Sequence, residues 1–224
     1  ACLVGSEMCI RDRNKVIGFG SHIQITNYDS QNTYEVNPIS KQQDFYPHLD
    51  TVDGIKHIQV FATKAGIVKT KDQIYGVVVK GIGSDYNWDF FQDKLVEGEH
   101  FVVKDEEADN QILISKHIAN KMKLKVNDKM FVYFIQSNGQ LRPKDFIISG
   151  IYQTDLEGFD DLYVIADISH IQKRNGWDIN QVGGFEILID DFKDLDQLGT
   201  YVYDNVGYDL FASTIKTQNP DIFS

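Results

Sequence analysis

The six histidines are the side chains of this sequence best suited to bind a metal ion or to transfer a proton near neutral pH. They are His22, His48, His57, His100, His117 and His170. No two of them stand at the spacing of metal ligands, and the H-E-x-x-H pattern of zinc hydrolases does not occur. The sequence therefore predicts no metal site. We interpret His117 and His170, each in an expected helix, as ordinary surface or boundary residues.

Two acidic runs, 104–110 "KDEEADN" and 190–196 "DDFKDLD", carry the oxygen ligands that calcium prefers. Neither has the glycine at the sixth place and the glutamate at the twelfth that an EF-hand loop requires. We expect a solvated loop at the first run and a helix start, favoured by the helix dipole, at the second. Sequence spacing alone pairs none of these carboxylates across a cleft, as glycoside hydrolysis would need.

The stretch "KGIGSD" places Gly81 and Gly83 directly after an expected strand, as in part of a phosphate-binding loop. It lacks the third glycine, the Lys-Ser/Thr pair and an immediate helix N-terminus, so it predicts a turn. The sequence also contains no G-x-S-x-G nucleophile elbow. Catalytic residues and cofactors are therefore not predicted, and a domain that binds, couples or transmits movement is the favoured class.

The composition indicates one globular domain or two closely joined subdomains, because the 224 residues are 42% hydrophobic and 25% charged. The formal net charge is −11 and we find no cluster of Lys and Arg, which argues against nucleic-acid binding. Cys2 and Cys9 are both in the first stretch, so the rest of the chain has no disulfide framework and no thiol nucleophile. This usage suits an oxidising compartment and is also common in cytosolic proteins. No apolar run reaches the ~18 residues of a membrane-spanning helix.

Hydrophobic periodicity predicts the elements that must position any site. Strands are expected at about 21–28, 111–114, 161–167, 183–190 and 208–216, and hairpins at 55–83 and 128–154. Helices are expected near 87–96, 115–124, 168–177 and 191–207, with Ser115 as an N-cap and Gly176 as a stop. A short helix is also expected near 45–49, where Pro47 limits it to a first turn or a broken one. The closing β, α, β order complements the opening β, α, β, β, so the two ends are expected to share one sheet with the middle inserted.

Five stretches, in a fixed order, carry a resemblance to a known family. They are 76–85 "GVVVKGIGSD", 95–101 "LVEGEHF", 112–134 "ILISKHIANKMKLKVNDKMFVYF", 146–169 "FIISGIYQTDLEGFDDLYVIADIS" and 183–192 "GGFEILIDDF". Over nearly all of 16–224 the chain resembles the extracytoplasmic, MacB-like periplasmic core domain of FtsX-like ABC transporter permeases. Within that family it is most similar to the LolC/LolE lipoprotein-releasing type.

The resemblance implies an α+β fold in two parts. A discontinuous Porter-like βαβ sheet subdomain would comprise 14–85 and 168–224, and an inserted, mixed α/β Sabre-like subdomain would comprise 86–167. The family also has one membrane helix before the first strand and another after the last. Residues 1–13 are therefore interpreted as an adapter or cloning artefact that stands in place of the first helix.

By the same resemblance the chain is the periplasmic domain of a bacterial inner-membrane protein and is not an enzyme. It would couple cytoplasmic ATP hydrolysis to extracytoplasmic movement in lipoprotein release or related export. The implied partners are a cytoplasmic ABC ATPase subunit, reached through the membrane helices, and a second permease copy or a paralogue.

A hairpin of the LolC type hooks a periplasmic lipoprotein carrier, and the matching residues here are Asn138, Gly139, Gln140, Leu141, Arg142 and Pro143. In a complex, Leu141 would supply an apolar anchor and Arg142 a charge-assisted contact. This hairpin is shorter than the family's hook, so a plain surface turn is the other interpretation.

Two other function classes stay open at this point. A free secreted module that binds a glycan or a peptide would have a signal peptide upstream and a stop codon soon after Ser224. A hydrolase would show a deep pocket lined by at least two convergent titratable groups.

Overall fold

The computed structural model describes residues 21–30, 36–136 and 138–220, so the expected leader 1–13 lies outside the described residues. The strands are β1 Ile23–Asn27, β2 Ile39–Ser40, β3 Ile55–Lys69, β4 Ile74–Ile82, β5 Leu95–Gly98, β6 Gln111–Ser115, β7 Lys129–Ile135, β8 Leu141–Tyr152, β9 Tyr163–Asp167, β10 Gln181–Val182, β11 Gly184–Ile189 and β12 Leu210–Thr214. The helices are α2 Lys116–Met122, α3 Glu157–Asp160, α4 Ser169–Asn175, α5 Leu195–Asn205 and α6 Ile215–Gln218. Short 3-10 turns occupy Tyr28–Ser30, His48–Thr51, Asp89–Phe91 and Phe192–Asp194.

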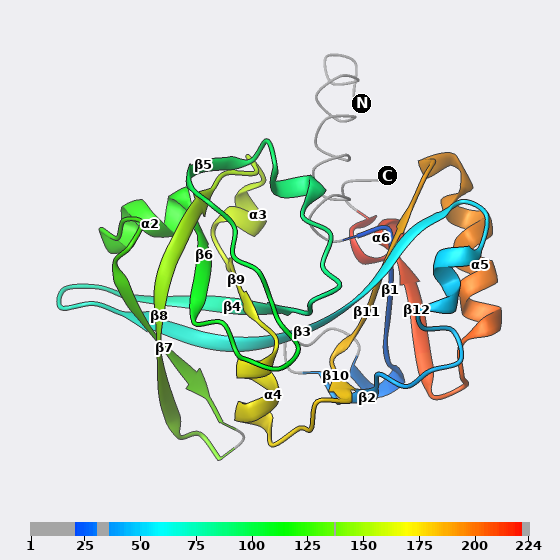
Figure 1. Ribbon diagram of the computed structural model, residues 1–224, viewed down its shortest axis with the longest axis horizontal. Coiled ribbons are helices and arrows are strands. Elements are labelled where there is room, and N and C mark those ends of the chain that lie inside the picture. The colour runs from blue at the N-terminus through cyan, green and yellow to red at the C-terminus, as the bar shows by residue number, and fades with distance from the viewer. Residues whose placement is uncertain (1–20, 31–35, 137, 221–224) are drawn as a thin grey trace.

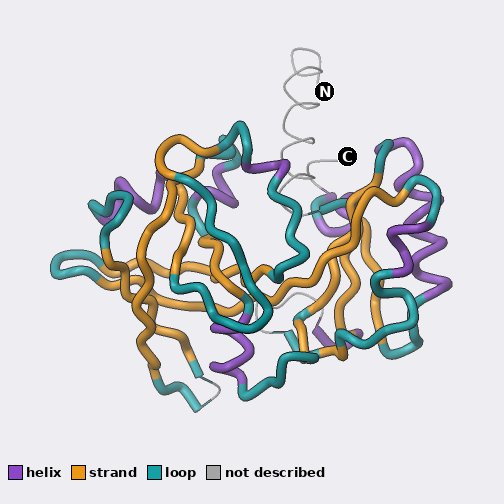
Figure 2. The backbone as a smooth tube through the Cα atoms, viewed as in Figure 1, coloured by secondary structure: helices purple, strands orange, loops and turns teal. Residues whose placement is uncertain are grey.

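Ten of the strands form one mixed sheet in the order β12-β1-β11-β3-β4-β9-β6-β8-β5, with β7 beside β3 and β8 (Figure 1). The strands β2 and β10 form a separate pair. The helices lie around the margins of the strands (Figure 2). This arrangement confirms the predicted α+β class.

The first described strand lies between two of the last. Strand β1 pairs antiparallel with β11, Ile23 opposite Ile187, and antiparallel with β12, Ile23 opposite Thr214. The alternating burial of Ile23 and Ile25 explains the register, because a slip of one residue would turn both side chains away from the core. The two ends of the described chain therefore share one sheet, as the sequence predicts.

The hairpin of β3 and β4 connects the two halves of the molecule (Figure 1). The first part of β3 pairs with β11, Ile58 opposite Ile187, and its far part pairs with β7, Gly66 opposite Phe134. Strand β4 pairs in parallel with β9 over Val78 to Ile82. The long hairpin therefore pairs with strands inside the proposed inserted part, 86–167, and with strands outside it. The boundaries of that part stay a prediction.

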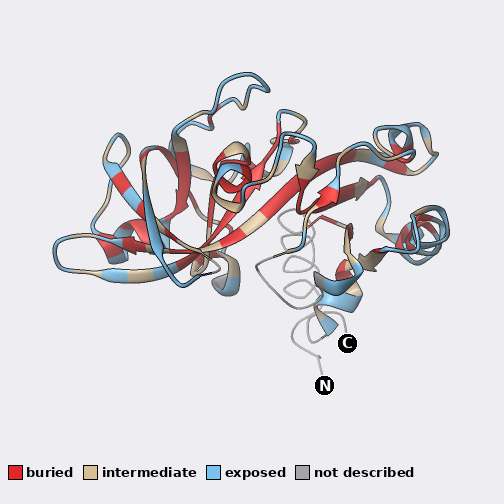
Figure 3. Ribbon diagram, turned by 90° about the horizontal axis from the view of Figure 1, so that it is seen from below, coloured by how far each residue is buried: buried red, intermediate tan, exposed pale blue. Residues whose placement is uncertain are grey.

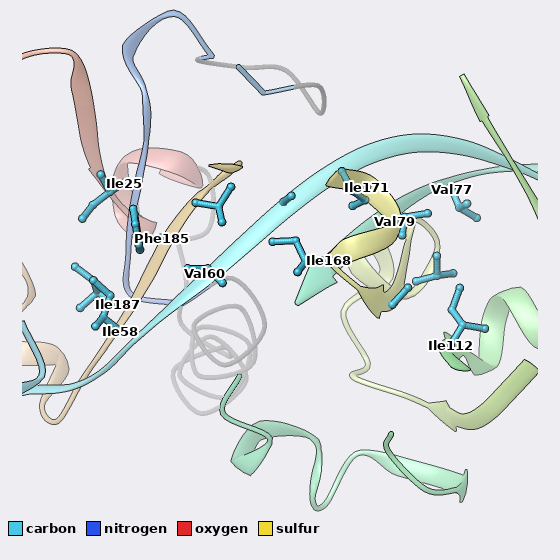
Figure 4. Packing of buried hydrophobic residues seen from close by; sticks show 14 of the residues in the cluster. Ile25, Ile58, Val60, Val77, Val79, Ile112, Ile168, Ile171, Phe185 and Ile187 are labelled. Atoms are coloured by element: carbon cyan, nitrogen blue, oxygen red, sulfur yellow. The ribbon is translucent and has the colours of Figure 1, made fainter. Parts of the chain in front are cut away.

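The main core follows β3 through both halves. Figure 4 shows Ile25, Ile58 and Phe185 at one end of it and Val79 and Ile112 at the other, all fully buried. The buried stretches of the long strands continue across the molecule in Figure 3. A second, aromatic cluster contains Ile82, Tyr86, Phe91, Phe101, Leu113, Tyr152 and Ile165.

Helices α2 and α4 form as the sequence predicts. The Ser115 hydroxyl accepts a hydrogen bond from the Ile118 amide at 3.0 Å, which caps the first turn of α2. Helix α4 ends at Gly176, whose φ of +69° is the left-handed conformation that glycine adopts without strain. Both predicted hairpins are also present.

One predicted helix is wrong. The segment 87–96 contains a single 3-10 turn, Asp89–Phe91, followed by strand β5. The aromatic side chains of this segment pack against distant parts of the chain instead. The ring of Trp88 stacks on that of His100, with centroids 4.7 Å apart, and the ring of Phe91 contacts that of Tyr152, with centroids 5.3 Å apart. The segment 45–49 is a series of turns that ends in the 3-10 turn His48–Thr51, which agrees with the broken turn expected from Pro47.

Candidate functional site

The predicted partner-binding residues gather at one hairpin tip between β7 and β8. The Gln140 amide donates to the Asn138 side-chain oxygen at 3.0 Å, and the Gly139 amide donates to the Gln136 carbonyl at 2.8 Å. Gly139 has a φ of +76°, which the turn requires and which glycine permits. Leu141 is half exposed and Arg142 is exposed. The described part of the tip is thus a polar turn with one apolar and one cationic side chain at its edge.

The base of this tip is fastened to α4. The Arg174 guanidinium donates to the Pro143 carbonyl at 3.0 Å and lies 6.0 Å from the centre of the Phe134 ring. Cation–π contact and the hydrogen bond together hold β8 against the helix. The structure therefore places Pro143 in a structural contact, and it leaves Asn138 to Arg142 at the surface.

The chemistry that the sequence analysis missed is a buried ion pair between β4 and β11, which lie on either side of β3. The Lys80 ammonium lies 2.7 Å from Glu186 Oε1, and the two side chains are 4% and 1% exposed. The Gln59 amide of β3 donates to Glu186 Oε2 at 3.0 Å, and the Gln24 amide of β1 lies 3.4 Å from Oε1. Four strands therefore meet at one carboxylate.

This ion pair fixes the loop after β4 as well. The Asn87 amide donates to Gln59 Oε1 at 2.8 Å, and Lys80 Nζ lies 5.9 Å from the centre of the Tyr86 ring. Burial, and secondarily the negative charge of Glu186, raise the pKa of Tyr86 well above its usual value, so its phenol is neutral. A carboxylate this fully hydrogen-bonded stabilises the junction of the strands and is poorly suited to transfer protons.

A cavity of about 270 Å³ lies above this cluster, between β11 and the 3-10 turn Asp89–Phe91. His22 and Lys56 line it together with Gln59, Tyr86 and Glu186. The Ile189 amide donates to His22 Nδ1 at 3.2 Å, so this nitrogen is unprotonated. Burial, and next the charge of Lys56, lower the pKa of His22 to about 4, which keeps the imidazole neutral in the physiological range.

A second polar network joins the segment before β3 to the loop after β4. Asp85 Oδ2 accepts hydrogen bonds from the Tyr46 hydroxyl at 2.8 Å and from the Val60 amide at 2.9 Å. His57 Nε2 donates to the Asp85 carbonyl at 2.6 Å, and Asp50 Oδ1 accepts from the Ile58 amide at 2.7 Å. Burial raises the pKa of Asp85 although these hydrogen bonds act in the opposite direction. The network anchors a loop to two strands.

The six histidines do not form a metal centre with their neighbours. Within the described ranges, no three His, Cys, Asp or Glu side chains are grouped so that they could hold a metal ion. His170 Nε2 donates instead to the Asp109 carbonyl at 2.7 Å, and His117 Nδ1 lies 3.2 Å from Asp161 Oδ1. His170 is buried, contrary to the boundary or surface position expected for it.

The part of the chain that the structure describes holds no helix both long enough and apolar enough to cross a membrane.

The same architecture occurs in two solved transporter structures. The extracellular domain of the ABC-type transporter YknZ from Gram-positive bacteria superimposes with a TM-score of 0.55 at 16% identity, over 86% of this chain and 99% of that domain. The periplasmic region of MacB from Actinobacillus actinomycetemcomitans gives a TM-score of 0.54 at 13% identity, over 93% of this chain and 96% of that region. This chain has their fold. Neither a protein-family model nor a curated protein matches the sequence.

The shared fold agrees with the two-part α+β layout that the resemblance implies. It extends over most of this chain and nearly the whole of both solved domains. A shared fold at this level of identity leaves the activity to be argued from the site.

Proposed function

We propose that this chain is the extracytoplasmic domain of an ABC transporter permease, which transmits movement and has no catalytic role. It would lie on the outer side of the bacterial inner membrane, in the periplasm. A cytoplasmic ABC ATPase subunit would drive it through membrane helices that flank the domain. The shared fold with YknZ and MacB supports this assignment.

The observation that carries the proposal is the pairing of the two ends of the described chain. Strand β12 is the direct antiparallel partner of β1, and the Ile215 amide donates to the His22 carbonyl at 2.9 Å. The chain therefore enters and leaves the sheet at one place. Two membrane helices attached there would be side by side, and their displacement would move the sheet as one body.

The polar junctions give the domain the stiffness that this role needs. The pair of Lys80 and Glu186 links β4 to β11, and the Gln59 amide adds β3. Force applied at β1 reaches the far half through β11, β3 and β4, which are neighbours in the sheet. Transmission of movement requires a continuous path of hydrogen-bonded strands of this kind, and it does not require a reactive side chain.

We infer that the transported substrate is a lipoprotein, because the stretches quoted above resemble the LolC/LolE type of permease. The tip formed by Asn138, Gly139, Gln140, Leu141 and Arg142 would then contact a periplasmic lipoprotein carrier. The exposure of Leu141 and Arg142 supports this role.

The first experiment is to sequence the gene on both sides of this segment and to map the topology of the full protein. Apolar segments of ~20 residues on each side would be membrane helices. Leu141→Cys in a cysteine-free full-length protein should react with a membrane-impermeant maleimide in cells whose inner membrane is intact. A signal peptide upstream and a stop codon soon after Ser224 would overturn the proposal in favour of a secreted binding module. Labelling only after the inner membrane is broken would overturn it in favour of a cytoplasmic protein.

The carrier contact is tested separately by site-specific photo-cross-linking at position 141 in the full protein. A cross-link to a periplasmic carrier should be lost on Arg142→Glu. Lys193→Glu makes the same charge change at an exposed lysine in the 3-10 turn before α5, and it serves as the control because α5 lies at the other end of the molecule (Figure 1). A tip that gives no cross-link to a soluble carrier would be the plain surface turn.

A further inference from the structure

A groove with three lysines lies at one end of this acidic protein. It has a volume of about 490 Å³ and lies beside α2 and the edge strand β5. Lys116, Lys123 and Lys125 line it, with Glu97 as its one carboxylate, and Val96 and Leu124 add apolar surface. The expectation that the chain has no cluster of basic residues is therefore wrong for this surface, which we call the α2 groove. Helix α2 and the turn after it bring together lysines that other residues separate in the sequence.

The lysines of the α2 groove are available for a partner. All three are exposed, and none takes part in an ion pair with another described residue. Val96 is 52% exposed, so apolar surface lies within the same groove. A mixture of cationic and apolar lining suits an acidic surface that also presents aromatic or aliphatic groups.

A surface of that kind covers α5 and the turn that follows it. The segment 190–209 contains six aspartates and one lysine. Tyr201, Tyr203 and Tyr208 are 41%, 59% and 100% exposed, and Asp204 and Asp209 are exposed beside them in the sequence. Tyr201 and Tyr203 leave the helix on different sides, so we call Tyr201, Asp204, Tyr208 and Asp209 the α5 face. Exposed tyrosines among charged residues are typical of protein interfaces, where the ring packs and the hydroxyl stays hydrated.

The two surfaces lie at opposite ends of the long axis of the molecule (Figure 1). One copy therefore cannot bring its own α5 face to its own α2 groove. A two-fold axis perpendicular to the long axis places the α2 end of one copy beside the α5 end of the other, and the same contact then forms twice. Such a pair closes on itself.

We propose that the α2 groove binds the α5 face of a second copy of this chain. Charge complementarity supports this occupant, because the groove gathers lysines and the α5 face gathers aspartates and tyrosines. Lysine ammonium groups near tyrosine rings would add cation–π attraction to the ion pairs. The inference deepens the proposed function, since it assigns surfaces to the second permease copy. The inference rests on the proposed function in one respect: a shared membrane would hold the two copies close together.

The decisive experiment is a charge swap on the 224-residue chain, measured by sedimentation velocity up to ~1 mM, an effective concentration that membrane tethering reaches. The groove variant carries Lys116→Glu, Lys123→Glu and Lys125→Glu, and the face variant carries Asp204→Lys and Asp209→Lys. The unchanged chain should associate at ~0.05 M salt and at least about tenfold more weakly at ~0.5 M, where screening is strong. Each variant alone should be at least about tenfold weaker, because like charges then meet.

An equimolar mixture of the two variants should associate again, since the new glutamates of one meet the new lysines of the other. The matched control, Lys69→Glu, Lys104→Glu and Lys173→Glu, makes the same total change at exposed lysines elsewhere and should associate like the unchanged chain. Circular dichroism verifies that every variant is folded. A chain that stays monomeric at ~1 mM and low salt, or a mixture that fails to recover, overturns the pairing. Neither result affects the topology experiment, so failure of this contact and failure of the proposed function are distinguishable.

Discussion

Lys80 and Glu186 show at the scale of single residues how the sheet is held at its centre. Replacement of Lys80 by Met leaves the Glu186 carboxylate buried without its counter-charge, although the glutamine amides remain. Breaking a buried pair in this way costs about 3–5 kcal/mol of the free energy of unfolding. We expect Lys80→Met to lose stability of that order in urea denaturation.

The paired replacement provides the control for that experiment. Lys80→Met with Glu186→Leu removes both charges, so the double variant should be more stable than Lys80→Met alone. Lys56→Met breaks an exposed pair with Asp89, at 49% and 61% exposure, and should cost less than about 1 kcal/mol. Equal losses for Lys80→Met and Lys56→Met would contradict the central role of the buried pair.

His22 makes the stability of the domain depend on pH. Its pKa falls from the usual 6.5 to about 4 on folding, chiefly through burial and next through Lys56. The unfolded chain therefore binds a proton at a pH where the folded chain does not. The stability that His22 contributes is complete above pH 6.5 and is lost as the pH falls towards 4, by roughly 3 kcal/mol in total.

The measurement is the free energy of unfolding across this pH range for the protein and for His22→Asn. The asparagine oxygen can still accept the hydrogen bond from the Ile189 amide. Carboxylates that titrate in the same range affect both proteins, so the difference between the two curves isolates His22. Parallel curves would show that the imidazole does not carry this dependence.

At the scale of elements, the start of α2 depends on one hydroxyl. Ser115 accepts from the Ile118 amide and donates to the Asp160 carbonyl, so its side chain joins α2 to the end of α3. Ser115→Ala removes the cap and leaves a buried carbonyl unpaired, which should cost about 1–3 kcal/mol in urea denaturation. Ser169→Ala at the start of α4 is the control, because the Ser169 hydroxyl is buried without a hydrogen-bond partner among the described residues. A loss of similar size at Ser169 would mean that the cap is not the cause.

The elements that the sequence predicts correctly are those whose pattern and end signals agree. Helix α2 has a serine cap, and α4 has a glycine stop, while the two hairpins have long β-branched strands with polar turns. The segment 87–96 lacks such agreement. Its aromatic spacing suggests a helix, but Trp88 and Phe91 have partners far along the chain, His100 and Tyr152. Tertiary packing then overrides the local period.

The candidate site is less accessible to sequence reasoning than the elements are. The tip from Asn138 to Pro143 is predicted only through the resemblance to the LolC type, and it stays a prediction. Lys80 and Glu186 each stand inside an apolar strand, and only the sheet order makes them neighbours. A charged residue within an otherwise buried strand is the one signal that predicts such a partner, because a buried charge is almost always paired.

At the scale of the whole molecule, the long hairpin determines whether the two halves unfold together. Strand β3 pairs with β11 in one half and with β7 in the other, and the main core follows it across. Loss of either half would expose apolar surface that the other half covers. We therefore expect a single cooperative transition, although a chain of this length often unfolds in steps.

Two tryptophans report on two different clusters of the core. Trp88 packs against the aromatic cluster in the proposed inserted part, and Trp177 packs against the main core just after α4. In Trp177→Phe only Trp88 fluoresces, and in Trp88→Phe only Trp177 does. Within each variant the fluorescence midpoint in urea should coincide with the midpoint from far-ultraviolet circular dichroism. A fluorescence midpoint separated from the circular dichroism midpoint in either variant would show that the core cluster around that tryptophan opens before the rest of the domain. A domain that opens in this way would absorb the movement it is proposed to transmit.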